Sequence, residues 1–146
     1  MISIYEKNFN LMVRLGILTT AGEPTFKESK KMKSGAYMDL NLDFLISTEK
    51  GVVIAMAHNY KQNGDVMADP DMEIRTVKNL KMFEALSFKQ DSTGTYQQVY
   101  TDETETILNP QIKKDLNIFL NTWLNNLIAQ GFSGSGQHSP VTEGVS

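Results

Sequence analysis

The sequence predicts one α+β domain, with an N-terminal helix, an antiparallel meander of about five strands and a long C-terminal helix packed on the sheet. Two observations predict this class. Short segments of alternating apolar and polar residues, typical of half-buried strands, follow one another between residues 38 and 100, with turn sequences between them. A segment with helical apolar spacing and capping signals lies on each side of this region. Strands linked by hairpins neighbour one another, and the flanking helices can then cover one face of the sheet.

The composition restricts the classes of protein to consider. The chain has 146 residues, enough for one sizeable core, and a formal net charge of −3, which gives no bulk attraction to nucleic acid or anionic lipid. It has no cysteine, so disulfides, thiolate nucleophiles and cysteine-ligated zinc or iron–sulfur sites are excluded. The first residues contain no long apolar run, so neither a signal peptide nor a membrane anchor is expected. We expect a soluble, cytoplasmic protein without a cofactor, and its oligomeric state is not specified.

The N-terminal segment predicts a helix followed by an exposed connection. Ser3 and Glu6 have the spacing of a capping box, and Gly16 offers a helix stop. Apolar residues at helical spacing share one face between them, namely Tyr5, Phe9, Met12 and Val13. From Thr19 to Gly35 this periodicity vanishes, and glycine, proline and lysine residues indicate a loop.

Five segments then have the pattern of strands. The first alternates regularly, and a turn at Glu49–Lys50–Gly51 joins it to a second whose two faces are both apolar, as in a central strand. The predicted strands are residues 38–46, 52–60, 72–77, 81–88 and 95–100.

The C-terminal segment predicts the long helix that covers the sheet. Asn109 is a suitable N-cap, Pro110 suits the first helical position, and a broad apolar stripe follows until a stop signal at Gly131–Phe132. Residues 133–146 have no periodicity and are expected to form a flexible tail. The predicted domain is therefore residues 1–132.

The stretch from residue 58 to 71 concentrates unusual polar residues and is expected to be a loop between the second and third strands. Asn63–Gly64 has the sequence of a tight turn, and Asp69–Pro70–Asp71 that of a rigid return to the sheet. Our leading hypothesis is a non-enzymatic accessory or interaction protein that recognises a protein partner through this surface. Its candidate binding residues are His58, Asn59, Asn63, Asp65, Asp69 and Asp71.

A small hydrolase is the first alternative. His58 could act as a general base or bind a metal with nearby carboxylates, because histidine titrates near neutral pH. The candidate catalytic set is His58, Asp65, Asp69 and Glu84. Neither a nucleophile nor a second histidine before the tail completes it, and no calcium-loop spacing is present, so we assign no catalytic residue and no metal. Glu84 itself is expected to reach the rim of the sheet or to pair with a cation such as Lys61 or Arg75.

Nucleic-acid binding is the second alternative. It would use a lysine cluster formed by Lys27, Lys30, Lys31 and Lys33. The cluster lacks arginine and aromatic residues, a composition more typical of a solvated loop than of a phosphate-binding surface.

Three runs of the chain resemble a family of small uncharacterised proteins from bacterial genomes, conjugative elements and phages. These runs are HNYKQNGDVMADPDMEIR, KMFEALSFKQDSTGTYQQVY and KKDLNIFLNTWLNNLIAQGF. The similarity spans Phe9 to Phe132, and its most specific pieces are Asn63–Gly64–Asp65, Asp69–Pro70–Asp71–Met72 and the segment from Trp123 to Phe132. The resemblance implies one intact domain and a bacterial or mobile-element origin, and it brings no activity, cofactor or catalytic residue.

Overall fold

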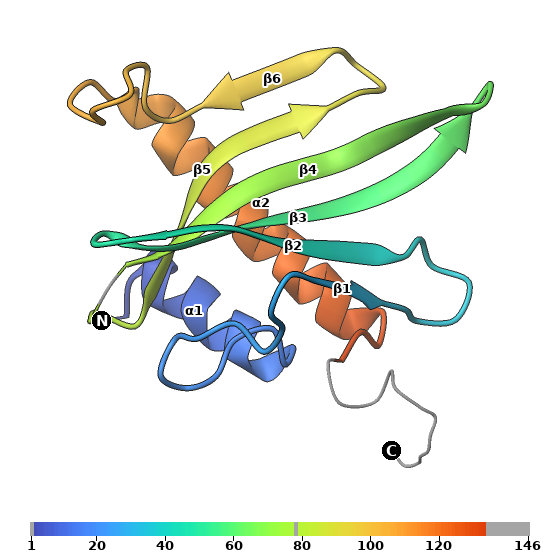
Figure 1. Cartoon of the computed structure of the whole chain (residues 1–146), viewed down its shortest axis with the longest axis horizontal. Helices are drawn as coiled ribbons and strands as arrows, with labels where there is room; N and C mark the ends of the chain where they lie inside the picture. Colours follow the sequence, from blue (N-terminus) through green and yellow to red (C-terminus); the bar gives the residue numbers. More distant parts are fainter. Residues whose placement is uncertain (1, 78, 134–146) are drawn as a thin grey trace.

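The computed structural model describes residues 2–77 and 79–133 and confirms the α+β fold (Figure 1). Helix α1 (Ile4–Arg14) precedes the sheet and helix α2 (Pro110–Ala129) follows it. The sheet contains β1 (Ser29–Met32), β2 (Leu40–Thr48), β3 (Gly51–Gln62), β4 (Asp65–Val77), β5 (Met82–Gln90) and β6 (Thr95–Gln98). Neighbouring strands pair antiparallel in chain order. The predicted tail lies outside the described residues, apart from Ser133.

The described part of the chain has six strands rather than the expected five, because β1 lies inside the predicted exposed connection. Its four residues pair with the start of β2, where Met32 lies opposite Leu40 and is fully buried. Three lysines in and beside so short a segment hid its alternation from the sequence pattern. The strand exists because β2 supplies a pairing edge and the core supplies a site for Met32.

The segment expected to be a loop at residues 58–71 is mostly strand. β3 and β4 pair until Gln62 and Asp65, and Asn63 (φ 54°) and Gly64 (φ 87°) form a two-residue turn between them. The Asp69–Pro70 step suggested a break, but it lies in a bulge of β4 with a cis peptide bond. A bulge is one of the few places in a sheet that accepts proline, because no ladder N–H is needed there.

Both helices have the ends that the sequence predicts. Ser3 Oγ accepts a hydrogen bond from Glu6 N–H, and Glu6 Oε1 accepts one from Ser3 N–H, which completes the capping box of α1. These bonds hold the pKa of Glu6 below its ordinary value. Asn109 Oδ1 accepts from the N–H groups of Gln111 and Ile112 at the start of α2.

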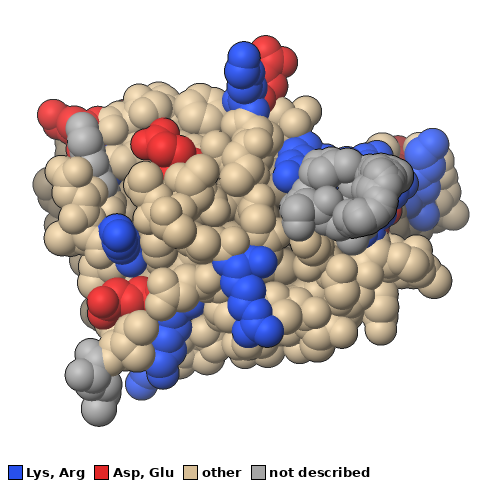
Figure 2. All heavy atoms as spheres, turned by 90° about the horizontal axis from the view of Figure 1, so that it is seen from below, with Lys and Arg blue, Asp and Glu red and all other residues tan. Residues whose placement is uncertain are grey.

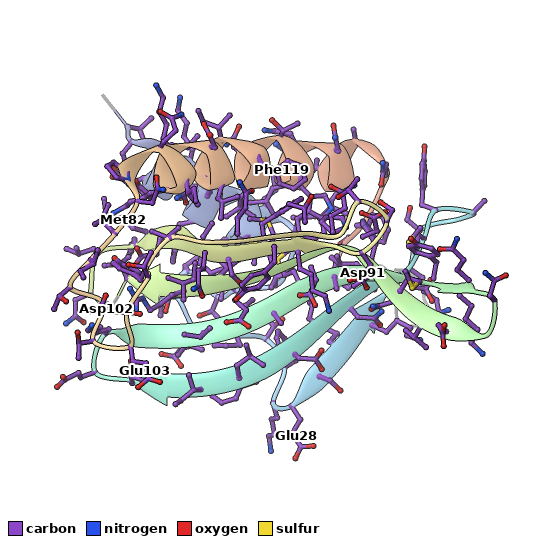
Figure 3. All side chains as sticks on the ribbon, turned by 90° about the horizontal axis from the view of Figure 1, so that it is seen from above. Glu28, Met82, Asp91, Asp102, Glu103 and Phe119 are labelled. Atoms are coloured by element: carbon purple, nitrogen blue, oxygen red, sulfur yellow. The ribbon has the colours of Figure 1, made fainter. Side chains whose placement is uncertain are left out.

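Within residues 2–77 and 79–133, both helices cover one face of the sheet and no helix lies on the opposite face (Figures 1 and 3). The covered face carries the core, in which Leu42, Met56, Met72 and Phe88 form one row across four strands. α2 buries apolar side chains against it, namely Leu116, Leu120, Trp123, Leu124 and Leu127. We call the other side of the sheet the open face.

A buried amide joins the two helices to the sheet. Asn117 is fully buried in α2, and its Oδ1 accepts a hydrogen bond of 2.9 Å from Ala85 N–H of β5. Its own carbonyl accepts one of 3.2 Å from Asn8 Nδ2 of α1, which is also fully buried. We call these two hydrogen bonds the joint. Because a buried polar group without a partner is costly in free energy, the joint fixes how both helices lie on β5.

We expect Asn117→Ala to lower the free energy of unfolding by about 2–3 kcal/mol, because the Ala85 N–H then lacks its acceptor in a buried site. Urea denaturation measures this loss. Asn126→Ala is the matched control, since Asn126 is exposed on the same helix, lies outside the bonds of this joint, and its substitution gains the same helix propensity; it should change stability by less than about 0.5 kcal/mol. Similar losses in both variants would contradict the role of the joint.

Candidate functional site

The end of the β3–β4 hairpin projects beyond the rest of the sheet, and we call residues 59–67 the arm. The pairing of β2 with β3 stops at His58, and the ladder between β5 and β4 stops at Asp71. Figure 1 shows the arm reaching past both neighbouring strands. Among the described residues, the arm therefore has two free edges. Val66 is 68% exposed close to its tip.

Hydrogen bonds fix the base of the arm. Asn41 Nδ2 donates to Asn59 Oδ1 at 2.7 Å on the β2 side. On the β5 side, Ala68 N–H donates to Asp91 Oδ2 at 2.7 Å, and Asp91 N–H donates to Ala68 O at 3.0 Å. Asp91 lies at the turn after β5, close to the point where the arm leaves the sheet (Figure 3). The arm is thus anchored on both sides at its base and free at its tip.

His58 lies on the covered face and not on the arm's exposed surface. Its Nδ1 is 3.0 Å from the carbonyl oxygen of Asp39, and because a carbonyl can only accept, Nδ1 carries the proton. The imidazole ring packs at 5.5 Å, edge to face, with Trp123 and at 6.1 Å with Phe132. His58 therefore ties the start of β2 to the end of α2.

The four candidate catalytic residues do not surround one reacting centre. Glu84 pairs opposite Arg75 on the open face, whereas His58 faces the helices. Through Arg75, Glu84 lies level with Val53 of β3. Val53 is five residues before His58 in that strand, a distance of roughly 16 Å at the usual strand rise. Asp65 lies at the tip of the arm, four residues beyond His58 on the paired strand, roughly 13 Å away. Asp69 alone is near His58, in the bulge opposite it.

The binding residues predicted for residues 58–71 separate into a tip and a base. Asn63 and Asp65 are exposed at the tip, while Asn59, Asp69 and Asp71 are half-buried at the base. No groups of three or more histidine, aspartate or glutamate side chains within residues 2–77 and 79–133 are placed to hold a metal ion. The predicted binding residues thus place amide and carboxylate side chains at both the tip and the base of the arm.

Asp71 is one of several neighbouring carboxylates on the open face, together with Asp43 and Asp91. In the register it lies between Ala57 and Lys89. Burial raises its pKa; Lys89 opposes this effect, and the carboxylates of Asp43 and Asp91 add to it.

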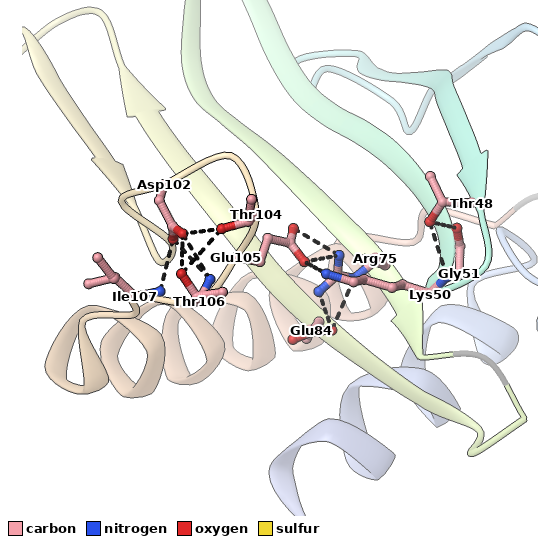
Figure 4. A network of polar contacts seen from close by, with 10 residues as sticks. All are labelled: Thr48, Lys50, Gly51, Arg75, Glu84, Asp102, Thr104, Glu105, Thr106 and Ile107. Carbon is pink, nitrogen blue, oxygen red and sulfur yellow. Dashed lines mark hydrogen bonds and ion pairs between the residues drawn. The ribbon is translucent and has the colours of Figure 1, made fainter.

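The best-connected polar cluster centres on Arg75, also on the open face (Figure 4). Its Nε and Nη2 both donate to Glu84 Oε2 at 3.1 Å, and its Nη1 donates to Glu105 at 2.8 and 3.0 Å. Lys50, from the β2–β3 turn, donates to the same Glu105 at 2.8 Å. The Tyr100 ring lies 5.9 Å from the Arg75 guanidinium carbon. The expectation of a cationic partner for Glu84 is met by Arg75.

Glu105 was not singled out from the sequence, although it connects three segments of the chain. It lies in the loop between β6 and α2, which Asp102 organises by accepting from the N–H groups of Thr106 and Ile107 at 3.0 and 2.8 Å. These bonds, with those from the hydroxyls of Thr104 and Thr106, hold the pKa of Asp102 far below its ordinary value. The partners of Glu105, Lys50 and Arg75, come from segments far away in the sequence.

The lysine cluster of the nucleic-acid alternative is partly neutralised. Lys33 Nζ is 3.0 Å from Asp39 Oδ2, and Lys31 Nζ is 4.0 Å from the same oxygen. Burial lowers the pKa of Lys30, whose stem lies on the covered side of β1. Figure 2, which looks at the side of α1, shows separate Lys and Arg groups with uncharged surface between them. Lys27 completes the predicted cluster and stands next to Glu28.

A cavity of about 630 Å³ lies at the opposite end of the sheet from the arm, between the β2–β3 turn and the segment 20–23. Hydroxyl groups are prominent in its lining, from Thr20, Ser47, Thr48 and Thr76. None of the residues predicted as binding or catalytic lines it.

Comparison with known protein families gives one match. The model of the domain of unknown function DUF6908 matches residues 11–133. The chain belongs to this family. The DUF6908 match begins and ends within two residues of the resemblance seen in the sequence, and it includes all six strands and α2. Neither the curated proteins nor the solved structures contain a match. No helix in the described part of this DUF6908 domain has the length and apolar character needed to cross a membrane.

The Glu105 cluster predicts a pH-dependent stability difference. Burial works to raise the pKa of Glu105, but the hydrogen bonds from Lys50 and Arg75 outweigh it and the pKa is lowered. Its contribution is therefore fully present above the unfolded-state value of 4.5 and is lost as the pH falls through the lower folded-state value. We expect Glu105→Gln to cost about 1–2 kcal/mol at pH 7 and progressively less below pH 4.5.

Chemical denaturation from pH 7 down to pH 3 measures this difference. Glu103→Gln is the control. Glu103 is an exposed residue of the same loop, and its substitution removes the same negative charge. A Glu105→Gln loss that stays constant over this pH range, or an equal effect of Glu103→Gln, would contradict the role of the ion pairs.

Proposed function

We propose that this protein is a non-enzymatic interaction protein that recognises a partner protein through the β3–β4 arm. One observation carries the proposal: the arm extends past β2 and β5, and both of its edges are free among the described residues. Backbone N–H and C=O groups on a free strand edge are a template for pairing with an extended segment of another protein.

The construction of the arm supports a role in recognition. A two-stranded hairpin alone is marginally stable in water, so a projecting one needs support at its base. Here Asn41 supports Asn59, and Asp91 supports Ala68. Close to the tip, the exposed Val66 offers an apolar contact opposite Lys61. The arm thus combines a fixed base with an accessible tip at little expense to the core.

The separation of the candidate catalytic residues supports the non-enzymatic part of the proposal. His58 is engaged with Asp39 and Trp123 on the covered face, and Glu84 is engaged with Arg75 on the open face. Catalytic groups have to reach one reacting centre, which these two cannot do from opposite faces. The lysine cluster gives the nucleic-acid alternative little support, since two of its members share Asp39.

The proposal places the protein in the cytoplasm of a bacterium, as an accessory component of a bacterial or mobile-element system. Two observations support this setting. The chain has no cysteine, which suits a reducing compartment, and its specific runs resemble proteins of bacterial genomes, conjugative elements and phages.

A shortened arm tests the proposal. Deleting Lys61, Gln62, Asp65 and Val66 joins the cross-strand pair Tyr60–Met67 directly through the Asn63–Gly64 turn and keeps the register. We expect this variant to keep its melting temperature within a few degrees, because all four deleted residues are exposed and lie outside the core. We also expect it to lose the partner that the wild-type protein cross-links in a lysate of its native host.

The identified partner is then purified and its affinity for both proteins measured by calorimetry. Thr93→Ala changes the exposed turn of another hairpin, β5–β6, and is the control. We expect this variant to bind the partner with wild-type affinity. An unchanged affinity of the shortened arm would refute the arm as the recognition element.

A further inference from the structure

A groove lies where the first turns of the two helices run side by side. The Lys113 ammonium lies 5.5 Å from the centre of the Tyr5 ring, and Asn8 contacts Asn117 one turn further along both helices. The helices are thus roughly parallel, and both begin at the same end of the molecule. The groove has a volume of about 390 Å³ and is lined by Ile4, Tyr5, Leu108, Pro110, Lys113, Lys114, Asn117 and Ile118.

The groove exposes large apolar side chains. Leu108 is 42% exposed and Ile118 is 48% exposed, and Ile107, just before the groove, is 60% exposed. Single exposed apolar residues are ordinary on a protein surface, but several gathered around one concave site mark a place where another molecule docks. Its volume falls within the range of sites that hold a ligand or a few side chains.

The charges of the groove have one sign. Lys113 and Lys114 are the charged residues of its lining, and no ion pair within the described residues involves either of them. The acids on the same helical turns are already engaged, since Glu6 caps α1 and Asp115 accepts from Gln111 at 2.8 Å. The first turn of α2 contains no acidic residue. Two lysines therefore lie beside an apolar groove without a carboxylate partner.

We propose that this groove binds an acidic amphipathic helical segment of a partner protein. Apolar side chains on one face of that segment would enter the groove between Ile4, Leu108 and Ile118, and its carboxylates would pair with Lys113 and Lys114. A concave site suits projecting side chains better than the flat surface of a membrane. The groove and the arm lie at opposite ends of the molecule (Figure 1), so this site is independent of the function proposed above.

Fluorescence anisotropy with a designed peptide tests the proposal. The probe is a labelled helix of about 16 residues, a little over four turns, with leucines on one face and glutamates on the other. The comparison peptide carries lysine in place of every glutamate. With wild-type protein, we expect the acidic peptide to bind at least about tenfold more tightly than the basic one, and the difference to shrink as salt is added.

Two variants locate the binding. Ile118→Glu and Lys114→Glu should each weaken binding of the acidic peptide by at least about tenfold, because one blocks the apolar contact and the other reverses a charge. Both sites lie on the surface of α2, and circular dichroism establishes that the variants are folded. Val66→Glu, on the arm, is the matched control and should leave the affinity unchanged.

In the peptide measurements, three outcomes would overturn the proposal: no binding of the acidic peptide, equal affinity for both peptides, or full binding by either variant. Sedimentation with vesicles of phosphatidylserine and phosphatidylcholine separates a membrane from a protein partner. If the wild type sediments with these vesicles and Lys114→Glu abolishes this, the groove is a lipid-binding surface and the proposed occupant is wrong. A failure of the arm experiment has no effect on any of these results.

Discussion

The burial of one face of the sheet under both helices is the constraint on which the rest of the structure depends. α1 and α2 cover the same side, so each central strand has one apolar face in the core and one face in contact with solvent or with loops. Asn117 fixes this arrangement, because its side chain satisfies a β5 backbone N–H inside the core. On the open face, the buried and half-buried charged side chains need partners of their own. Arg75 provides them by donating to both Glu84 and Glu105. That cluster joins β4, β5 and the loop before α2.

The same constraint separates the surfaces available for function. His58 falls on the covered face, where it packs with Trp123, while Asp71 and Glu84 fall on the open face. Alternation along a strand makes this separation unavoidable, since neighbouring residues point to opposite sides. A site that draws residues from both faces cannot form within the regular part of the sheet. Two of the surfaces that remain lie at the ends of the molecule: the arm at one end and the groove between the helix starts at the other.

These two surfaces differ in the kind of contact that they can make. The arm presents backbone groups on free edges and a small apolar contact at Val66, a combination suited to adding a strand. The groove presents apolar side chains and two lysines on a helical surface, a combination suited to receiving a helix. Their separation would allow a small domain to hold two partners, or two parts of one partner, without any change in its core.

Local signals in the sequence were enough to determine the helix ends, the tight Asn63–Gly64 turn and the order of alternating segments, because capping, positive-φ turns and periodicity involve residues close together in the chain. They predicted the α+β fold and missed β1, whose pairing with β2 cannot be recognised in four residues containing two lysines. They also suggested a loop where β3 and β4 continue, because a bulge accommodates Pro70 only when a neighbouring strand is present. The partners of Arg75, the position of His58 against Trp123 and the groove between the helix starts were decided by the tertiary structure. Apart from the Arg75–Glu84 pair, which joins neighbouring strands, the interacting groups lie far apart in the sequence, and only the folded arrangement of the sheet, its helices and its loops brings them together.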